Sequence, residues 1–395
     1  MPEILIIADD LSGATDCGMT LASAGVDTVL LLDSRGPLSD ADALVLDLDT
    51  RRLPAEPAAA LNVDAARRLH APGTALFMMA GAGAGPHWAA EIAAVHIALT
   101  GDGQEPRLAV VVPPVAVADA QTQLSDAGLQ TERAAPGLFG RGDATVRAAL
   151  RDWLENGVEA VVCEATSPDD LASLARVTGE QRERMFWVGP ADLVRHLPGA
   201  LGVERRAPAE PALPTPLDPV LVVVGSGCET AHAQAAVLAD SGGVRVLSVE
   251  PHVLRVGPGT AEWGHAERDL REALGNGGDV LLRLPDGPPP PAEQRHALAV
   301  ALGRLVHEQG PRIGGLVLSG GETVRAVLAA LGIGAVRMLD ALEPGVPVGV
   351  TEGPRPIPLI LKTGSSGEPE TLVRARQRLR MTALPPVPDA GRGGA

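Results

Sequence analysis

The sequence predicts an α/β protein of two domains, each a mostly parallel sheet flanked by helices. Three observations lead to this prediction. Short, continuous apolar segments alternate with helical stretches in both halves of the chain, which is typical of parallel strands covered on both faces. The 395 residues suit two domains better than one. Residues 207–219 are rich in proline and lack apolar periodicity, so we expect a linker there.

The first domain is expected to span residues 1–206. It opens with a short apolar strand at residues 4–7, followed by a turn and a helix that Gly25 ends. Further strands are expected at residues 28–32, 44–48, 76–79, 109–112 and 160–163, with helices at residues 57–69 and 89–99.

The second domain, residues 220–383, repeats this pattern. Strands are expected at residues 220–224, 244–249, 280–284, 316–319 and 358–361, and helices at residues 231–239, 292–308 and directly after Gly321. In the last of these helices, apolar residues recur at the spacing of a single helical face. Residues 286–291 are expected to form a loop, and the Pro- and Gly-rich residues 384–395 a disordered tail.

Composition narrows the class of protein. The formal net charge of −16 disfavours nucleic acids and anionic membranes as partners. The three cysteines form neither a paired framework nor a CxxC motif, which favours a reducing compartment and argues against structural zinc. There is no apolar run of about 18 residues or more, and the amino-terminal segment has the pattern of a strand rather than a signal peptide. We therefore predict a cytoplasmic protein without a membrane span.

The strongest local site is the turn Ser-Gly-Gly-Glu-Thr at residues 319–323. Parallel sheets bind ligands at the carboxyl ends of their strands, and this turn joins such an end to a helix. The two glycines let the backbone approach a ligand closely, and the helix N-terminus offers N–H groups to a phosphate. Because a carboxylate repels phosphate, Glu322 would not contact the phosphate itself. It would face a ribose hydroxyl or a metal ion, or cap the helix. A turn of this kind also occurs for packing alone.

A second glycine-rich turn, KTGSSG at residues 362–367, follows the last predicted strand. It contains Lys362, the single lysine of the chain. A compact ammonium group retained among many arginines indicates a position that a planar guanidinium cannot fill. The turn suits a phosphate-binding loop but lacks the GxxxxGK[ST] pattern. The alternative is a flexible surface turn in which the lysine survives by chance.

A third turn, Gly225-Ser226-Gly227, does not complete the dinucleotide-binding pattern GxGxxG, because Thr230 stands where the third glycine is required. NAD is therefore disfavoured. The nine histidines show no HExxH or other metal-ligand spacing, and a GxSxG elbow is absent. Hydrolase and metalloenzyme classes gain no support.

Carboxylates gather after the first strand. Asp9 and Asp10 end it, and Asp16 follows within the predicted helix. One of these carboxylates would accept a proton from a substrate hydroxyl or hold Mg²⁺ through water, and helix capping is the structural alternative. Arg51 follows another strand end, where it would clamp a carboxylate in a bidentate way or lie exposed in solvent.

Together these motifs resemble the four-carbon acid sugar kinase family along nearly the whole chain. The family opens with ADDLTGA, and residues 8–14 read ADDLSGA. Its second domain carries GGET or GGDT, found at residues 320–323, and then a stretch like LEPGVP, found at residues 342–347. The family's KSGxFG corresponds to residues 362–367, with Ser366 in place of the aromatic residue. Its Gly-Ser turn with a later Thr and Gln matches Gly225, Ser226, Thr230 and Gln234.

The resemblance implies an N-terminal domain for a sugar acid, a C-terminal domain for ATP, and phosphorylation of a terminal hydroxyl on acids such as threonate, erythronate or their 3-oxo relatives. Asp9 or Asp10 would orient or deprotonate that hydroxyl, while Lys362 and Mg²⁺ would stabilise the transferring phosphoryl group. Arg51 and Asp16 would contact the acid. The residues that would contact ATP are Ser226, Gly320, Gly321, Glu322, Thr323 and Gly364.

The first domain departs from the family pattern. Members carry K-x-D-S-T-L-R-G-N where residues 79–87 read MAGAGAGPH, although Glu91 still matches. Residues 114–122 also lack the arginine of a second family stretch, P-x-x-G-R-T-T. Three readings follow: a kinase with an altered acceptor, a catalytically inactive nucleotide-binding homologue with a regulatory role, or another α/β enzyme of the same architecture. The oligomeric state is left open, with a homodimer among the alternatives.

Overall fold

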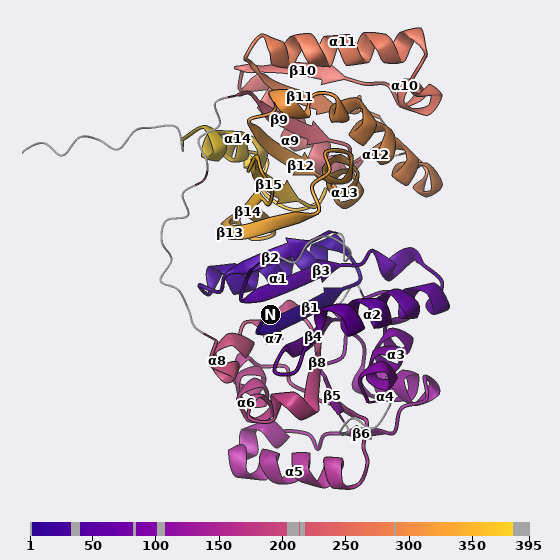
Figure 1. The fold of residues 1–395 in the computed structure, drawn as a ribbon, viewed down its shortest axis with the longest axis vertical. Helices are drawn as coiled ribbons and strands as arrows, with labels where there is room; N and C mark the ends of the chain where they lie inside the picture. The colour runs from indigo at the N-terminus through magenta and orange to yellow at the C-terminus, as the bar shows by residue number, and fades with distance from the viewer. Residues whose placement is uncertain are drawn as a thin grey trace, which may run out of the picture. The chain divides into compact units, whose positions relative to one another are not determined.

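The computed structural model of the chain describes residues 2–32, 40–81, 84–100, 107–203, 213, 218–287 and 290–381. The chain divides into two compact units (Figure 1). Unit 1 comprises Met1–Pro211 and Ile333–Ala341, and unit 2 comprises Ala212–Gly332 and Leu342–Ala395. Of the predicted linker at 207–219, only residues 213, 218 and 219 are described, and the predicted tail at 384–395 lies outside the described residues.

Within the described residues, unit 1 contains nine strands in the order β13-β2-β3-β1-β4-β8-β5-β7-β6. All recorded pairings between them are parallel except that of β13 with β2. The strands are β1 (Ile4–Ala8), β2 (Thr28–Leu31), β3 (Ala43–Asp47), β4 (Ala75–Met79), β5 (Leu108–Val111), β6 (Thr131–Arg133), β7 (Ala160–Val162), β8 (Met185–Gly189) and β13 (Ala335–Glu343).

The core of unit 1 lies on both faces of the central strands. Every residue of β1 is buried, so side chains pointing to either face of the sheet lie under helices. The helices are α1 (Leu11–Ser23), α2 (Ala55–Leu69), α3 (Trp88–Thr100), α4 (Val117–Asp126), α5 (Asp143–Glu155), α6 (Pro168–Gly179), α7 (Ala191–Val194) and α8 (Leu197–Leu201), with short 3₁₀ turns η1 (Thr50–Arg52), η2 (Leu138–Arg141) and η3 (Arg182–Arg184).

The part of unit 2 that the structure describes has six strands in the order β10-β11-β9-β12-β15-β14, parallel except for β14 against β15. They are β9 (Val220–Val224), β10 (Val244–Ser248), β11 (Asp279–Arg283), β12 (Gly315–Ser319), β14 (Val346–Thr351) and β15 (Pro358–Lys362). The helices are α9 (Glu229–Asp240), α10 (Pro251–Val256), α11 (Ala261–Gly275), α12 (Ala292–His307), α13 (Gly321–Ala330) and α14 (Thr371–Met381), with η4 (Gly310–Arg312).

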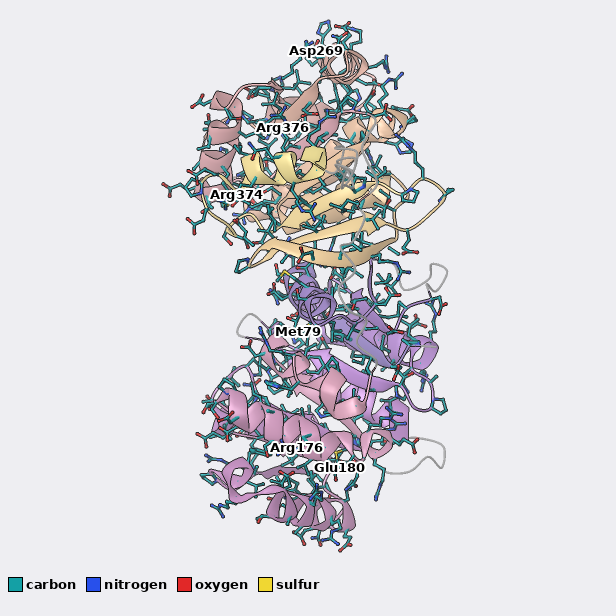
Figure 2. All side chains as sticks on the ribbon, turned by 90° about the vertical axis from the view of Figure 1, so that its left-hand side faces the viewer. Met79, Arg176, Glu180, Asp269, Arg374 and Arg376 are labelled. Carbon is teal, nitrogen blue, oxygen red and sulfur yellow. The ribbon has the colours of Figure 1, made fainter. Side chains whose placement is uncertain are left out.

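Ion pairs tie α14 to the rest of unit 2. Arg376 and Arg380 both pair with Asp279, a carboxylate that is almost fully buried at the start of β11. Arg374, which is labelled beside Arg376 in Figure 2, pairs with Glu343. The guanidinium and hydrogen-bond partners hold the pKa of Asp279 below its usual value although burial opposes this. Both carboxylates are therefore charged anchors for the last described helix.

The structure confirms the α/β fold and places most predicted strands within one or two residues. It adds elements that were not predicted from the sequence: the strands β6, β8, β13 and β14, and the helices α4 to α8, α10, α11 and α14. The strand β13 also carries Ala335–Ala341 into unit 1, whereas the sequence predicted one continuous second domain over residues 220–383. Among the described helices, none is long and apolar enough to cross a membrane.

Candidate functional site

Three glycine-rich turns begin at the same edge of the sheet in unit 2. The adjacent strands β9, β12 and β15 are parallel, and their last residues, Val224, Ser319 and Lys362, stand in register across the three strands. The turns singled out from the sequence at residues 225–227, 320–323 and 363–367 follow directly. Sequence-distant segments are thus brought together at the carboxyl ends of a parallel sheet, where such folds bind ligands.

The three turns approach one another so closely that only glycine fits at the contacts. A Cβ atom on Gly364 would overlap the hydroxyl of Ser226, and one on Gly225 would overlap the hydroxyl of Thr323. Gly320 has φ +104°, and a Cβ there would lie 3.2 Å from the Cβ of Ser226. The glycines therefore serve the assembly of the site as well as any approach of a ligand to the backbone.

The turn after β12 ends in a free helix N-terminus. Helix α13 begins at Gly321, and its N-cap residue Gly320 provides no side-chain cap for the first N–H groups. Unpaired N–H groups at the start of a helix attract phosphate. Thr323 is buried in the first turn, and Glu322 lies beside it. This geometry fits the expected anion-binding turn.

Lys362 ends β15 with a side chain that is only 3% exposed. Its Nζ donates hydrogen bonds to the Ser319 hydroxyl at 3.1 Å and to the carbonyl oxygens of Thr363 at 2.6 Å and Gly364 at 3.3 Å. Burial lowers the pKa of Lys362 to about 8, while the neighbouring Cys228 and Glu343 favour the charged form. The ammonium group thus links the last residue of β12 to the turn that follows β15.

The loop after Lys362 is anchored by a buried amide. Gln234 on α9 is fully buried, and its Nε2 donates to the carbonyl oxygens of Ser366 at 3.0 Å and Glu368 at 2.9 Å. The hydroxyls of Thr363 and Ser366 lie 2.5 Å apart within the loop. These contacts fix the backbone of residues 363–368, so the loop offers a preformed surface to a ligand.

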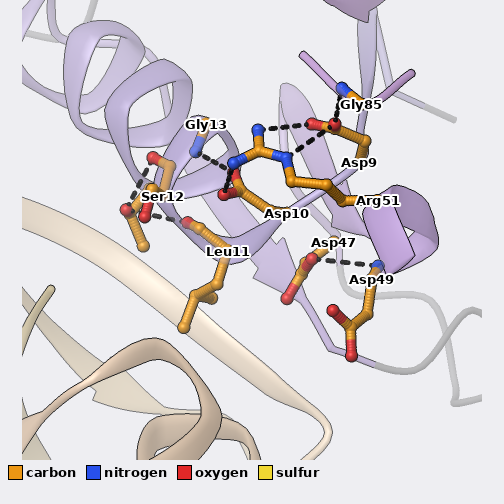
Figure 3. A network of polar contacts seen from close by, with 10 residues as sticks. Asp9, Asp10, Leu11, Ser12, Gly13, Asp47, Asp49, Arg51 and Gly85 are labelled. Atoms are coloured by element: carbon orange, nitrogen blue, oxygen red, sulfur yellow. Dashed lines mark hydrogen bonds and ion pairs between the residues drawn. The ribbon is translucent and has the colours of Figure 1, made fainter. Parts of the chain in front are cut away.

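In unit 1, Arg51 and the two aspartates after β1 form one network (Figure 3). The Nε and Nη2 atoms of Arg51 donate to the Oδ2 and Oδ1 atoms of Asp9 at 3.0 and 3.1 Å, a bidentate pair. Its Nη1 lies 2.5 Å from Oδ2 of Asp10. The backbone N–H of Gly85 adds a bond of 2.9 Å to Oδ2 of Asp9.

Although Asp9 and Asp10 are adjacent in the sequence, both face the same arginine side chain. Strand β1 ends at Ala8, so the alternation of side chains ends there too, and both carboxylates meet the same guanidinium. Asp10 also caps α1, because its Oδ1 accepts from the N–H of Gly13 at 2.8 Å. Capping and ion pairing therefore coexist in Asp10. Desolvation opposes ionisation of Arg51, but the hydrogen bond to Asp9 and the surrounding carboxylates raise its pKa above the usual value.

Other aspartates near this network differ in their exposure to solvent. Asp16 lies on the exposed side of α1. Asp47, at the end of β3, is buried and acts electrostatically on Arg51, and Asp49 follows with φ 52°, a left-handed conformation that aspartate tolerates. Asp47 and Asp49 were not among the predicted site residues, although the alternating aspartates of LDLDTRR at a strand end are a signal for them. Among the described residues, no group of three or more His, Cys, Asp or Glu side chains is arranged to hold a metal ion.

The segment that departs from the family pattern lies against this network. Residues 79–87 connect β4 to α3, and residues 82 and 83 lie outside the part of the chain that the structure describes. A Cβ on Gly85 would lie 3.3 Å from Cα of Arg51 and 3.4 Å from Oδ2 of Asp9. The backbone here approaches the ion pair directly. Two further polar residues that were not among the predicted site residues, Asn62 and Glu91, are buried next to Asp9.

Comparisons with known proteins match the two halves of the chain to two different domain models. Residues 4–119 match a family model described as a sugar-binding N-terminal domain, and residues 221–372 match a nucleotide-binding C-terminal domain. The chain is 33% identical to a D-threonate kinase of Cupriavidus necator, over 96% of this chain and 99% of the relative. It is 29% identical to a 3-oxo-tetronate kinase of the same organism, over 96% and 97% of the two chains.

A solved structure shows the same fold. The crystal structure of a putative tRNA synthase from Salmonella typhimurium LT2 matches with a TM-score of 0.76 at 18% sequence identity, over 96% of this chain and 99% of that one. At this identity the match concerns the fold alone. Because a curated relative exceeds 30% identity along essentially the whole chain, and both halves match the paired domain models, this chain belongs to the four-carbon acid sugar kinase family, a family of ATP-dependent sugar acid kinases.

Proposed function

We propose that the protein transfers the γ-phosphoryl group of ATP to a hydroxyl of a four-carbon sugar acid or a closely related small acid. The observation that carries this proposal is the convergence of three glycine-rich turns at one sheet edge of unit 2, beside a free helix N-terminus and a buried ammonium group. Such an arrangement provides N–H groups and positive charge for a triphosphate. ATP contacts are assigned to Ser226, Gly320 to Thr323, and Gly364.

Lys362 acts at the base of this site. Because its Nζ bonds to carbonyl oxygens on the turn, it holds the loop in place and adds positive charge close to the phosphates. Catalysis of phosphoryl transfer depends largely on positioning and on stabilising charge, and a fixed ammonium group does both. We therefore assign Lys362 an electrostatic and loop-positioning role in catalysis.

Unit 1 supplies the acceptor site in this proposal. Asp9 is held in place by the bidentate contact with Arg51 and by the N–H of Gly85. Its Oδ1 accepts only one of these bonds and retains a lone pair for a substrate hydroxyl. The hydroxyl proton passes to an aspartate as the oxygen attacks the γ-phosphorus and ADP leaves. Asp9 is the first candidate, because Asp10 is already engaged in capping α1. Arg51 orients these carboxylates and is available to a substrate carboxylate, and Asp16 stays a prediction for an outer acceptor contact.

Mg²⁺ fits this chain as an ion carried by ATP. Both oxygens of Asp9 and both of Asp10 already accept bonds from protein groups, and the described residues form no cluster of three metal ligands. Magnesium in kinases usually keeps several waters and binds through substrate phosphates and one or two carboxylates. When bound, it would neutralise negative charge on the phosphates.

The relatives define the acceptors to test first, D-threonate and 3-oxo-tetronate. The replaced family stretch at residues 79–87 removes charged side chains beside Asp9, so we propose an altered preference among such acids. We also propose a cytoplasmic location, since Cys17, Cys163 and Cys228 are all free thiols. Light scattering of the purified chain tests whether it forms a homodimer, one of the alternatives left open for its oligomeric state.

The decisive experiment is incubation of the purified chain with ATP, Mg²⁺ and a panel of four-carbon acids, with mass spectrometry of the products. We expect a phosphorylated acid and one equivalent of ADP. Asp9→Asn should lower the rate at least about a hundredfold. Asp269→Asn is the matched control, because Asp269 is exposed on α11, as labelled in Figure 2. Tight ATP binding without transfer to any acid of the panel would contradict the proposal.

A further inference from the structure

A buried carboxyl group lies behind the Asp9–Arg51 pair in unit 1. Glu91 is in the first turn of α3 and is only 7% exposed. Asn62 on α2 is 2% exposed, and its Nδ2 donates to Oε2 of Glu91 at 3.2 Å and to the carbonyl oxygen of Ala58 at 3.0 Å. A carboxyl without a cationic partner is costly to bury in its charged form. Its position therefore calls for an explanation beyond packing.

A small cavity connects Glu91 to Asp9. The cavity is lined by both carboxyl residues, by Asn62 and by apolar side chains including Trp88. Its volume of about 10 Å³ is close to the room that one water molecule needs, and three polar residues line it. A change in the charge of Glu91 would therefore act on Asp9 across a small space that both residues line.

The charge balance around Glu91 is simple. Asp9, from the turn after β1, is the charged residue that acts on it, while α2 and η1 face it with the neutral Asn62 and Thr50. Burial, and then the charge of Asp9, raise the pKa of Glu91 to about 7, while the hydrogen bond from Asn62 and the neighbouring Thr50 hydroxyl oppose the shift. Arg51 is directed to Asp9 and Asp10. Loss of the Glu91 proton would thus place a second negative charge behind Asp9.

We propose that Glu91 is a positioning residue for phosphoryl transfer, which in its protonated form keeps the acceptor site receptive to an anion. This inference rests on the proposed kinase function and deepens it. Glu91 need not touch the substrate, and no bond to it forms or breaks during transfer. When Glu91 loses its proton, its charge repels Asp9 and adds negative potential behind the site that would receive a substrate carboxylate. Binding of the acidic acceptor should then weaken.

The consequence is a pH dependence confined to the acceptor. In the native chain, the KM for the acid should rise severalfold from about pH 6 to about pH 8 as Glu91 ionises, while the KM for ATP, which binds in unit 2, should not follow it. Glu91→Gln mimics the protonated form, and its KM for the acid should stay near the low-pH value of the native chain throughout. Glu56→Gln makes the same chemical change on the exposed side of α2 and should behave like the native chain.

Thermal unfolding provides a readout that does not depend on activity. A carboxyl whose pKa is higher in the folded chain stabilises the fold most at low pH, and this contribution is lost as the pH rises through the folded pKa. The melting temperature of Glu91→Gln relative to the native chain should therefore rise from about pH 5 to about pH 8. A constant difference would overturn the inference, since it would mean that Glu91 holds no proton in this range.

The outcomes separate the inference from the function on which it rests. A native chain that transfers no phosphate to any acid would overturn the proposed function and the inference together. An active chain whose Glu91→Gln variant shows the same rise in acceptor KM with pH would overturn only the inference. Flat acceptor KM in Glu91→Gln, with the native rise retained in Glu56→Gln, is the result we expect.

Discussion

Replacing the sole lysine offers a sharp test of the nucleotide half of the proposal. Lys362 is 3% exposed, and burial lowers its pKa from 10.5 to about 8. At about 1.36 kcal/mol per pKa unit, this shift means that burial destabilises the charged form of Lys362 by about 3 kcal/mol. A side chain kept charged at this cost and bonded to a glycine-rich turn is expected to serve a ligand. Lys362→Met should therefore separate stability from activity.

The difference in stability between the native chain and Lys362→Met should change with pH in a defined direction. Between about pH 8 and pH 10.5, the folded native chain has shed the Lys362 proton while the unfolded chain still binds it, so native stability rises with pH. Relative to Lys362→Met, the native chain should gain about 3 kcal/mol across this range. Near pH 7 the variant should be as stable as the native chain or more stable. Its kinase rate should fall at least about a hundredfold, in the range seen when one stabilising donor is lost.

The composition of the chain makes this comparison clean. There is no tyrosine and no second lysine, and both proteins share the three cysteines. Burial raises the pKa of Cys17 and of Cys163 well above the ordinary value of a thiol. Urea unfolding of the two proteins at about pH 7, 8.5 and 10 measures the difference directly. Labelling with ¹³C-lysine adds a single side-chain signal whose midpoint should lie near pH 8 and whose position should change on adding ATP. A midpoint near the ordinary value of about 10.4, or a fully active Lys362→Met, would refute the reasoning.

Three further substitutions test other parts of the site. Arg51→Lys keeps the charge but loses the bidentate contact, so kcat/KM should fall about tenfold to a hundredfold in steady-state assays, and an unchanged value would remove the network from the acceptor site. Gly364→Ala directs a Cβ at the Ser226 hydroxyl and should raise the KM for ATP at least severalfold, whereas Gly140→Ala, with open space around its Cβ, should not. Gln234→Leu removes two buried hydrogen bonds and should lower the free energy of unfolding by about 1–3 kcal/mol in denaturant titrations; equal stability would show that the loop is held by other contacts.

The sequence predicts the parallel strands well because each is a short, continuous apolar run. Strand β9 was placed to the residue at 220–224. Strand β8, with the sequence MFWVG, was missed although it lies centrally in unit 1, because two arginines and a glutamate precede it closely. The strand β13 carries arginine and aspartate among its apolar residues, so its pattern does not stand out. Pairing across more than 300 residues, as between β13 and β2, leaves no local signal in either segment.

The same contrast holds for the candidate site. The three turns of unit 2 were found because glycine and small hydroxyl residues after a strand are a local pattern, and the structure brings them together as expected. The partners of Arg51 were not predictable in the same way, because Asp9 and Gly85 reach it from separate strand ends. Glu91 and Asn62 sit on different helices and meet only in the folded chain. Their pairing depends on tertiary packing, which the sequence pattern does not encode locally.

The return of the chain to unit 1 has a consequence for dissecting the protein. A fragment cut in the proline-rich segment would retain β2 but lose the strand Ala335–Met338 that covers its open side. The bare edge of β2, with the sequence TVLL, would then present unpaired backbone groups next to apolar side chains, which favours association between copies. Expression of the amino-terminal half alone should give aggregates. Joining residues 333–341 to that half through a short glycine-rich connector should restore a stable, separately folding unit.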